Sequence, residues 1–141
     1  MPAVLLAAVA ACTSTAGNPP VEHAGGAAPA YEAPAGAPDF CTRLAGLQEL
    51  DRLPVSIGTL AAGADVEART QVSAAMRELR GVLSSVRSEG RNEDLAGSLD
   101  GLVRALGQVG DGPLPGPVLG EVTAGLQQVA VLAQPVCEFP T

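Results

Sequence analysis

Apolar residues recur every three or four positions along four stretches of the chain. The stretches are residues 40–53, 72–86, 95–109 and 118–133. This spacing follows the 3.6-residue period of the α-helix, so each stretch predicts a helix with one apolar face. Four such helices within residues 39–141 can bury these faces only against one another. The pattern therefore predicts an all-α fold, a small antiparallel four-helix bundle.

Capping residues and prolines predict the ends of these helices. Asp39, Asp65 and Asn92 precede the first three apolar stripes, where a side-chain oxygen can accept a hydrogen bond from a first-turn amide. Pro54 is expected to end the first helix, because proline lacks the amide donor that a helix interior needs. The residues that follow, 55–64, are interrupted by glycine and are expected to form a connector.

Glycine and proline mark the remaining boundaries. Gly90 is suited to end the second helix in the left-handed conformation, and residues 110–113, Gly-Asp-Gly-Pro, are expected to close the third. Pro117 is expected to be the first residue of the fourth helix (the N1 position), where a missing amide donor costs nothing. Pro135 is expected to end that helix.

Two of the three cysteines lie at the two ends of the predicted bundle. In an up-and-down bundle the first helix starts beside the end of the fourth, which is where Cys41 and Cys137 fall. We therefore predict that these two residues form a disulfide that closes the bundle, with Phe40 and Phe139 packed over it. The alternative is a pair of buried free thiols.

The third cysteine follows an apolar run. Residues 4–11 are all apolar, and the sequence VAAC at 9–12 resembles the bacterial lipobox, in which an aliphatic residue and two small residues precede a cysteine. In proteins with that motif the thiol receives a diacylglyceryl group and the segment before it is removed. The resemblance implies a signal peptide at residues 1–11, a lipidated Cys12, and a lipoprotein anchored at the extracytoplasmic face of the cell membrane.

Composition adds to this resemblance and also leaves alternatives open. All eight basic residues are Arg, a bias typical of a very GC-rich genome and of lipoproteins of the actinobacterial type. The basic stretch that opens a signal peptide is missing, so we expect a translation start upstream of Met1. Residues 8–10, Ala-Val-Ala, also fit a plain cleavage site, which would give a freely secreted protein, and the run could instead be a buried helix. A retained membrane span would need about 20 apolar residues, more than this run contains.

A tether is expected between the anchor and the bundle, over residues 12–38. This stretch is dense in Ala, Gly and Pro and has no apolar period, so it predicts a disordered spacer. His23 and Tyr31 lie in it. Without a second ligand at a useful spacing, we interpret both as solvated linker residues and not as metal or haem ligands.

Charge and residue types exclude several functions. A net charge of −7 disfavours nucleic acid, because phosphate binding requires basic groups that release counterions. The predicted bundle contains no His and no Lys to activate a nucleophile, and bridged cysteines cannot ligate a metal. We therefore expect a protein that is not an enzyme and that has no cofactor and no metal site.

One charged surface stands out on the second predicted helix. At about 100° per residue its arginines fall within an arc of about 80° beside the apolar stripe. They are Arg69, Arg77, Arg80 and Arg87. We interpret this surface first as a solvated face whose arginine stems cover the edge of the core. The alternative is a docking surface for an envelope protein or an anionic polymer.

These observations predict a non-enzymatic binding or scaffold component of the cell envelope, attached to the membrane through its N-terminal lipid. The alternative function is a carrier of an apolar ligand. A bundle interior lined by Leu and Val, with few aromatic residues and many glycines, can open a cavity between its helices.

Overall fold

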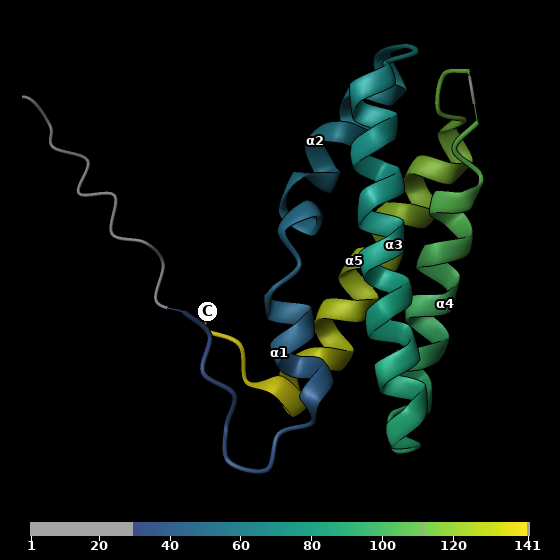
Figure 1. Cartoon of the computed structure of the whole chain (residues 1–141). Helices are drawn as coiled ribbons and strands as arrows, with labels where there is room; N and C mark the ends of the chain where they lie inside the picture. Colours follow the sequence, from purple (N-terminus) through teal and green to yellow (C-terminus); the bar gives the residue numbers. More distant parts are fainter. Residues whose placement is uncertain (1–29, 111, 141) are drawn as a thin grey trace, which may run out of the picture.

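A computed structural model describes residues 30–110 and 112–140 of the chain, and this part is all-α (Figure 1). The helices pack antiparallel, as predicted. They are α1 (Asp39–Ala45), α2 (Gln48–Ala62), α3 (Val66–Glu89), α4 (Glu93–Gly107) and α5 (Gly116–Cys137). The predictions for residues 1–29, which include Cys12 and His23, fall outside the described residues.

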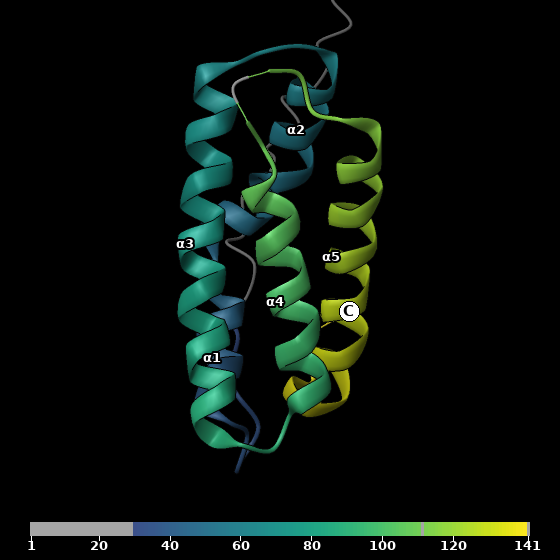
Figure 2. The same ribbon diagram turned by 90° about the vertical axis from the view of Figure 1, so that its right-hand side faces the viewer.

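The described part has five helices, so the predicted number of four is wrong. α1 and α2 follow one another along α3 and together form one arm of the bundle (Figures 1 and 2). The break falls at Gly46 and Leu47, because Leu47 adopts an extended conformation with ψ 96° and thereby starts a new helix. The remaining arms are α3, α4 and α5.

Pro54 does not end a helix, and residues 55–64 are not a connector. Pro54 lies inside α2, where it leaves the carbonyl of Leu50 without its helical donor at a cost of about 3 kcal/mol or more. The helix persists because Leu53, Ile57 and Leu60, one or two turns apart, are all buried on its inner face. Of the two glycines in this stretch, Gly58 lies on the exposed face of α2, and Gly63 is the C-cap at which the helix ends.

Two of the predicted caps on α3 are confirmed. The Asp65 carboxylate accepts a hydrogen bond of 2.7 Å from the amide of Ala68, and Gly90 ends the helix in the left-handed conformation with φ 66°. Asn92 occupies the position before α4, but its side chain makes no capping hydrogen bond. α4 ends at Gly107, three residues before the predicted Gly110 turn.

The predictions for the prolines at the two ends of α5 had different outcomes. Pro117 lies in the first turn of α5 but is its second residue, because the helix begins one residue earlier than predicted, at Gly116. Pro135 does not end α5, which continues to Cys137 and ends where Glu138 donates its amide to the Gln134 carbonyl at 2.8 Å. At the start of α1, Pro38 holds the extended cap position, so Asp39 is the first helical residue instead of the cap.

The core is built almost wholly from Leu, Val and Ala, because the chain has few aromatic residues. Among the described residues Ser56 is the one buried polar side chain, and its hydroxyl donates to the Gln71 side chain on α3 at 2.5 Å. α4 packs closely on α5 at Gly125, where an added Cβ would lie 3.2 Å from a methyl carbon of Leu102. No described helix has the length and apolar character needed to cross a membrane.

The predicted disulfide is confirmed. Cys41 in α1 and Cys137 at the end of α5 are both fully buried and are bonded to one another, with their Cα atoms 5.3 Å apart. The bonded residues are 96 positions apart in the chain, and the two helices that carry them otherwise touch little. The disulfide therefore holds α1, the first helix of the bundle, to the end of α5, the last one.

Two aromatic residues near the disulfide contact one another. Phe40 is fully buried, but Phe139 is only half-buried and packs on Tyr31, with ring centroids 4.9 Å apart. The Tyr31 hydroxyl donates a hydrogen bond of 2.5 Å to the Cys137 carbonyl. Tyr31 is therefore not a solvated linker residue: it attaches the last part of the predicted tether to the bundle.

An apolar cleft as the candidate functional site

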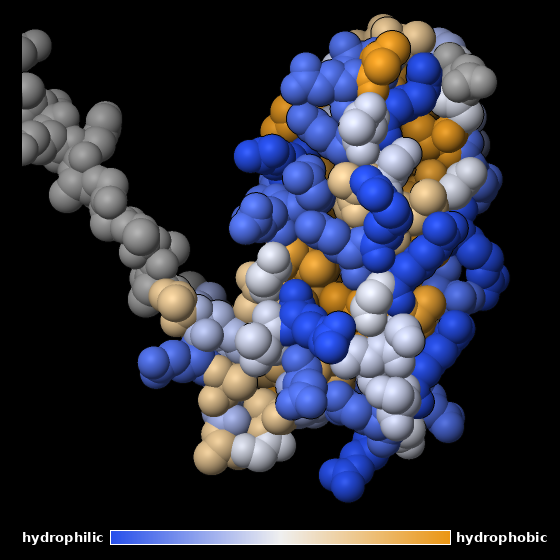
Figure 3. Space-filling view, in the orientation of Figure 1, coloured by the Kyte–Doolittle hydropathy of each residue, from blue (hydrophilic) through white to orange (hydrophobic). Residues whose placement is uncertain are grey.

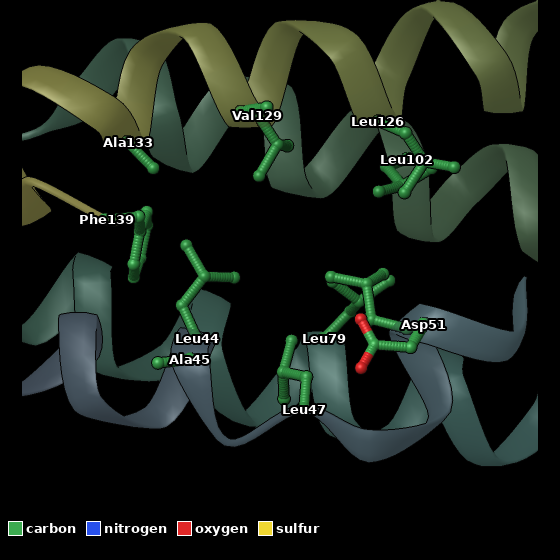
Figure 4. A pocket seen from close by; sticks show the side chains of 12 residues that line it. Leu44, Ala45, Leu47, Asp51, Leu79, Leu102, Leu126, Val129, Ala133 and Phe139 are labelled. Atoms are coloured by element: carbon green, nitrogen blue, oxygen red, sulfur yellow. The ribbon is translucent and has the colours of Figure 1, made fainter. Parts of the chain in front are cut away.

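The gap between the first arm and α5 is an apolar cleft of about 250 Å³ (Figure 4). Leu44, Leu47 and Leu50 form the wall that comes from α1, the break and α2. Leu79 from α3 and Leu102 from α4, both fully buried, form its floor. The break after α1 thus lies directly beside the cleft.

Small side chains on α5 explain why the opposite wall leaves space. Leu126 and Val129 line one half of that wall, and Ala130 and Ala133 line the other half. The side chain of alanine is three carbon atoms smaller than that of leucine. Neighbouring helices move only partly into the space that this difference leaves. The cleft is therefore a consequence of the taper from large to small residues along α5.

The mouth of the cleft is apolar and open to solvent. Leu47, Leu50 and Leu126 are only half-buried, although each belongs to the apolar face of its helix. On the face that carries the first arm and α3, the space-filling view shows apolar residues exposed between polar side chains (Figure 3). Covering these leucines would remove apolar surface from water, which is favourable at about 25 cal/mol per Å².

The aromatic residues at the disulfide limit one end of the cleft. Phe139 lines this end, and its ring is held by the contact with Tyr31. Asp51 lies near the other end, where its exposed carboxylate is the one charged group among the described lining residues (Figure 4). The cleft is therefore an apolar slot with a single polar end.

The structure divides the predicted arginine surface on α3. Arg69 donates to the backbone carbonyls of Gly110 and Gly112 at 2.7 and 3.2 Å, so it holds the loop between α4 and α5. Arg87 forms an ion pair of 3.1 Å with Asp100 on α4. These two arginines are engaged within the bundle and are not simply part of a docking surface.

Arg77 and Arg80 remain as the exposed part of that surface. Within the described residues neither side chain forms a hydrogen bond or an ion pair. They lie on α3 outside the set of residues that line the cleft.

Among the described residues, one carboxyl has a clearly shifted pKa, and it is Asp100, away from the cleft. The hydrogen bond from Arg104, one turn further along α4, lowers the pKa of the Asp100 carboxyl below its usual value, and Arg87 contributes in the same direction. This arrangement links α3 to α4. Among the described residues no group of three His, Cys, Asp or Glu side chains is placed to hold a metal ion.

The residues of the cleft were missed by reasoning from the sequence, because their leucines were assigned to the core. The available signal was the pair Ala130 and Ala133 on the apolar face of the fourth stripe, opposite a first stripe made of leucines. No protein-family model, no curated protein and no solved structure matches the chain.

Proposed function

We propose that the protein is a non-enzymatic binding component of the bacterial cell envelope whose cleft takes an apolar ligand. The observation that carries this proposal is the slot between α5 and the first arm, with half-buried leucines at its mouth. The lipobox-like sequence before Cys12 supports attachment to the extracytoplasmic face of the membrane. The disulfide also supports export, because such bonds persist in oxidising compartments.

The size of the cleft limits the ligand to a small one. Pockets for drug-sized molecules enclose about 300 to 1,000 Å³, so a slot of about 250 Å³ is at or below the lower end. A small apolar molecule gains from covering the leucines at the mouth, and it loses part of that gain to ordering and desolvation on binding. We therefore expect modest affinity and a negative heat-capacity change on binding.

Filling the cleft tests the proposal. Ala130 lines the slot but is exposed, so Ala130→Phe should place a ring in the space without disturbing the buried core. We expect isothermal titration calorimetry to show octanol binding to the wild-type chain and at least about tenfold weaker binding to the variant, a loss of about 1.4 kcal/mol.

A matched substitution on the same helix controls for added hydrophobic surface. Ala124 is also exposed on α5 but lies outside the cleft, so Ala124→Phe should bind octanol as the wild type does. Thermal unfolding should show all three chains folded. Equal octanol affinity in wild type and Ala130→Phe, or no octanol binding by the wild type, would contradict the proposal.

The exposed arginines support a second candidate function, contact with an anionic envelope partner. Arg77 and Arg80 are the members of the predicted surface that the bundle leaves unpaired within the described residues. In a chain of net charge −7, these two neighbouring arginines form a small positive surface that attracts anionic groups.

Charge reversal tests this second function. We expect Arg77→Glu/Arg80→Glu to abolish retention on an anionic matrix at low salt, where surface charges are least screened. The control is Arg43→Glu/Arg91→Glu, which makes the same change of net charge at exposed positions elsewhere. If both variants elute at the same salt concentration as the wild type, the arginine surface is merely solvated.

A further inference from the structure

The single charged residue of the cleft suggests which class of ligand the cleft selects. Asp51 forms no hydrogen bond or ion pair through its carboxylate within the described residues. The neighbouring cation, Arg52, lies 3.9 Å from a carboxylate oxygen of Glu49 instead. A negative group without a protein partner therefore stands at the edge of an otherwise apolar slot.

The dimensions of the slot fit one alkyl chain. Its wall on α5 extends from Leu126 to Ala133, which is about 10 Å along the helix axis at 1.5 Å per residue. A cavity of about 250 Å³ is at or below the lower end of the range for drug-sized ligands, so it takes one short chain.

The orientation of such a chain follows from the two ends of the slot. Phe139 closes one end with an aromatic ring, which suits the terminal methyl group of a chain. Asp51 stands near the other end, beside solvent, where a polar head group keeps its hydration (Figure 4). A carboxylate head would be repelled there, whereas an ammonium head would form a charge-assisted hydrogen bond.

We infer that the cleft binds a single-chain amphiphile with a cationic ammonium head group, its chain along α5 and its head at the Asp51 carboxylate. This inference rests on the proposed apolar-ligand function and adds the length, the number of chains and the charge of the ligand. The acidic character of the whole chain acts in the same direction, because it raises the local concentration of cations.

Three probes of equal chain length test the head-group preference on the full chain. Octylammonium, octanol and octanoate are titrated by calorimetry at neutral pH and low salt, below their micellar concentrations. We expect octylammonium to bind about fivefold more tightly than octanol, as a partly exposed ion pair allows, and octanoate to bind more weakly than octanol. The advantage of octylammonium should shrink as salt is added.

Two isosteric variants separate the local carboxylate from the net charge. Asp51→Asn should bind octylammonium no more tightly than octanol. Asp94→Asn removes the same charge at an exposed position at the start of α4, outside the cleft, and should retain the preference for octylammonium.

The outcomes distinguish this inference from the function on which it rests. Octanol binding without any preference for octylammonium would overturn the inference and leave the apolar-ligand function standing. Absence of binding by all three probes would overturn both. A dimer of the chain that octanol dissociates would make a second copy the occupant of the cleft and would also overturn the inference.

Discussion

Replacing Cys41 and Cys137 together by alanine is expected to lower the free energy of unfolding by about 4 to 5 kcal/mol. The bond joins residues 96 positions apart, so it closes almost the entire folded part into one loop. In the chain-entropy model a loop of that length removes about this much conformational freedom from the unfolded state. For a domain of this size the loss corresponds to a fall in Tm on the order of 20 °C.

Urea unfolding of the oxidised protein, the reduced protein and the double alanine variant measures this effect. Alanine is used because both sulfur atoms are fully buried, and a serine hydroxyl there would add the cost of an unpaired buried polar group. The reduced wild type should match the variant within about 1 kcal/mol. A loss below about 1 kcal/mol would mean that the contacts of α1 alone hold it in place and that the bond adds little.

The disulfide was predictable because two independent patterns agreed on it. The four apolar stripes required an up-and-down arrangement, and that arrangement placed Cys41 beside Cys137. Asp65 and Gly90 were equally predictable, since a cap and a left-handed terminus depend on a few neighbouring residues. At these positions the capping residues and cysteines agreed with the arrangement that the apolar stripes predicted.

The sequence predictions were wrong where tertiary packing outweighs the local conformational preference of a residue. Pro54 and Pro135 weaken a helix at one hydrogen bond each, but the buried residues around them stabilise the helix by more than that. The break at Leu47 could not be predicted from the stripe, because the apolar spacing continues across it without interruption. Tyr31 was misassigned because its partners, the Cys137 carbonyl and the Phe139 ring, are more than 100 residues away.

The cleft is a property of how helices meet, so the sequence contains only an indirect sign of it. A leucine on an apolar face is equally compatible with a tight core and with the wall of a slot. The difference depends on the residue opposite, and the small pair Ala130 and Ala133 faces the leucines of the first arm only in the folded chain. For the same reason, only the folded chain shows that Asp51 is the charged residue at the edge of the slot.

Truncating the floor of the cleft is expected to cost stability and to change which ligand fits. Leu79 is fully buried, so Leu79→Ala should lower the free energy of unfolding by about 2 to 5 kcal/mol. A natural domain of typical stability survives such a loss. The removed side chain widens the slot, so the variant should bind the bulky alcohol adamantanol, which the wild type should exclude.

Leu99→Ala separates these two consequences. Leu99 is also fully buried, on α4, but it does not line the cleft. The variant should lose a similar amount of stability in urea unfolding and should bind octanol in preference to adamantanol, as the wild type does. If both variants have the same ligand preference, Leu79 does not form a wall of the binding site. If only Leu79→Ala gains adamantanol binding, the ligand lies against α3. The pair therefore tests packing and binding with the same chemical change, because only one of the two leucines faces the slot.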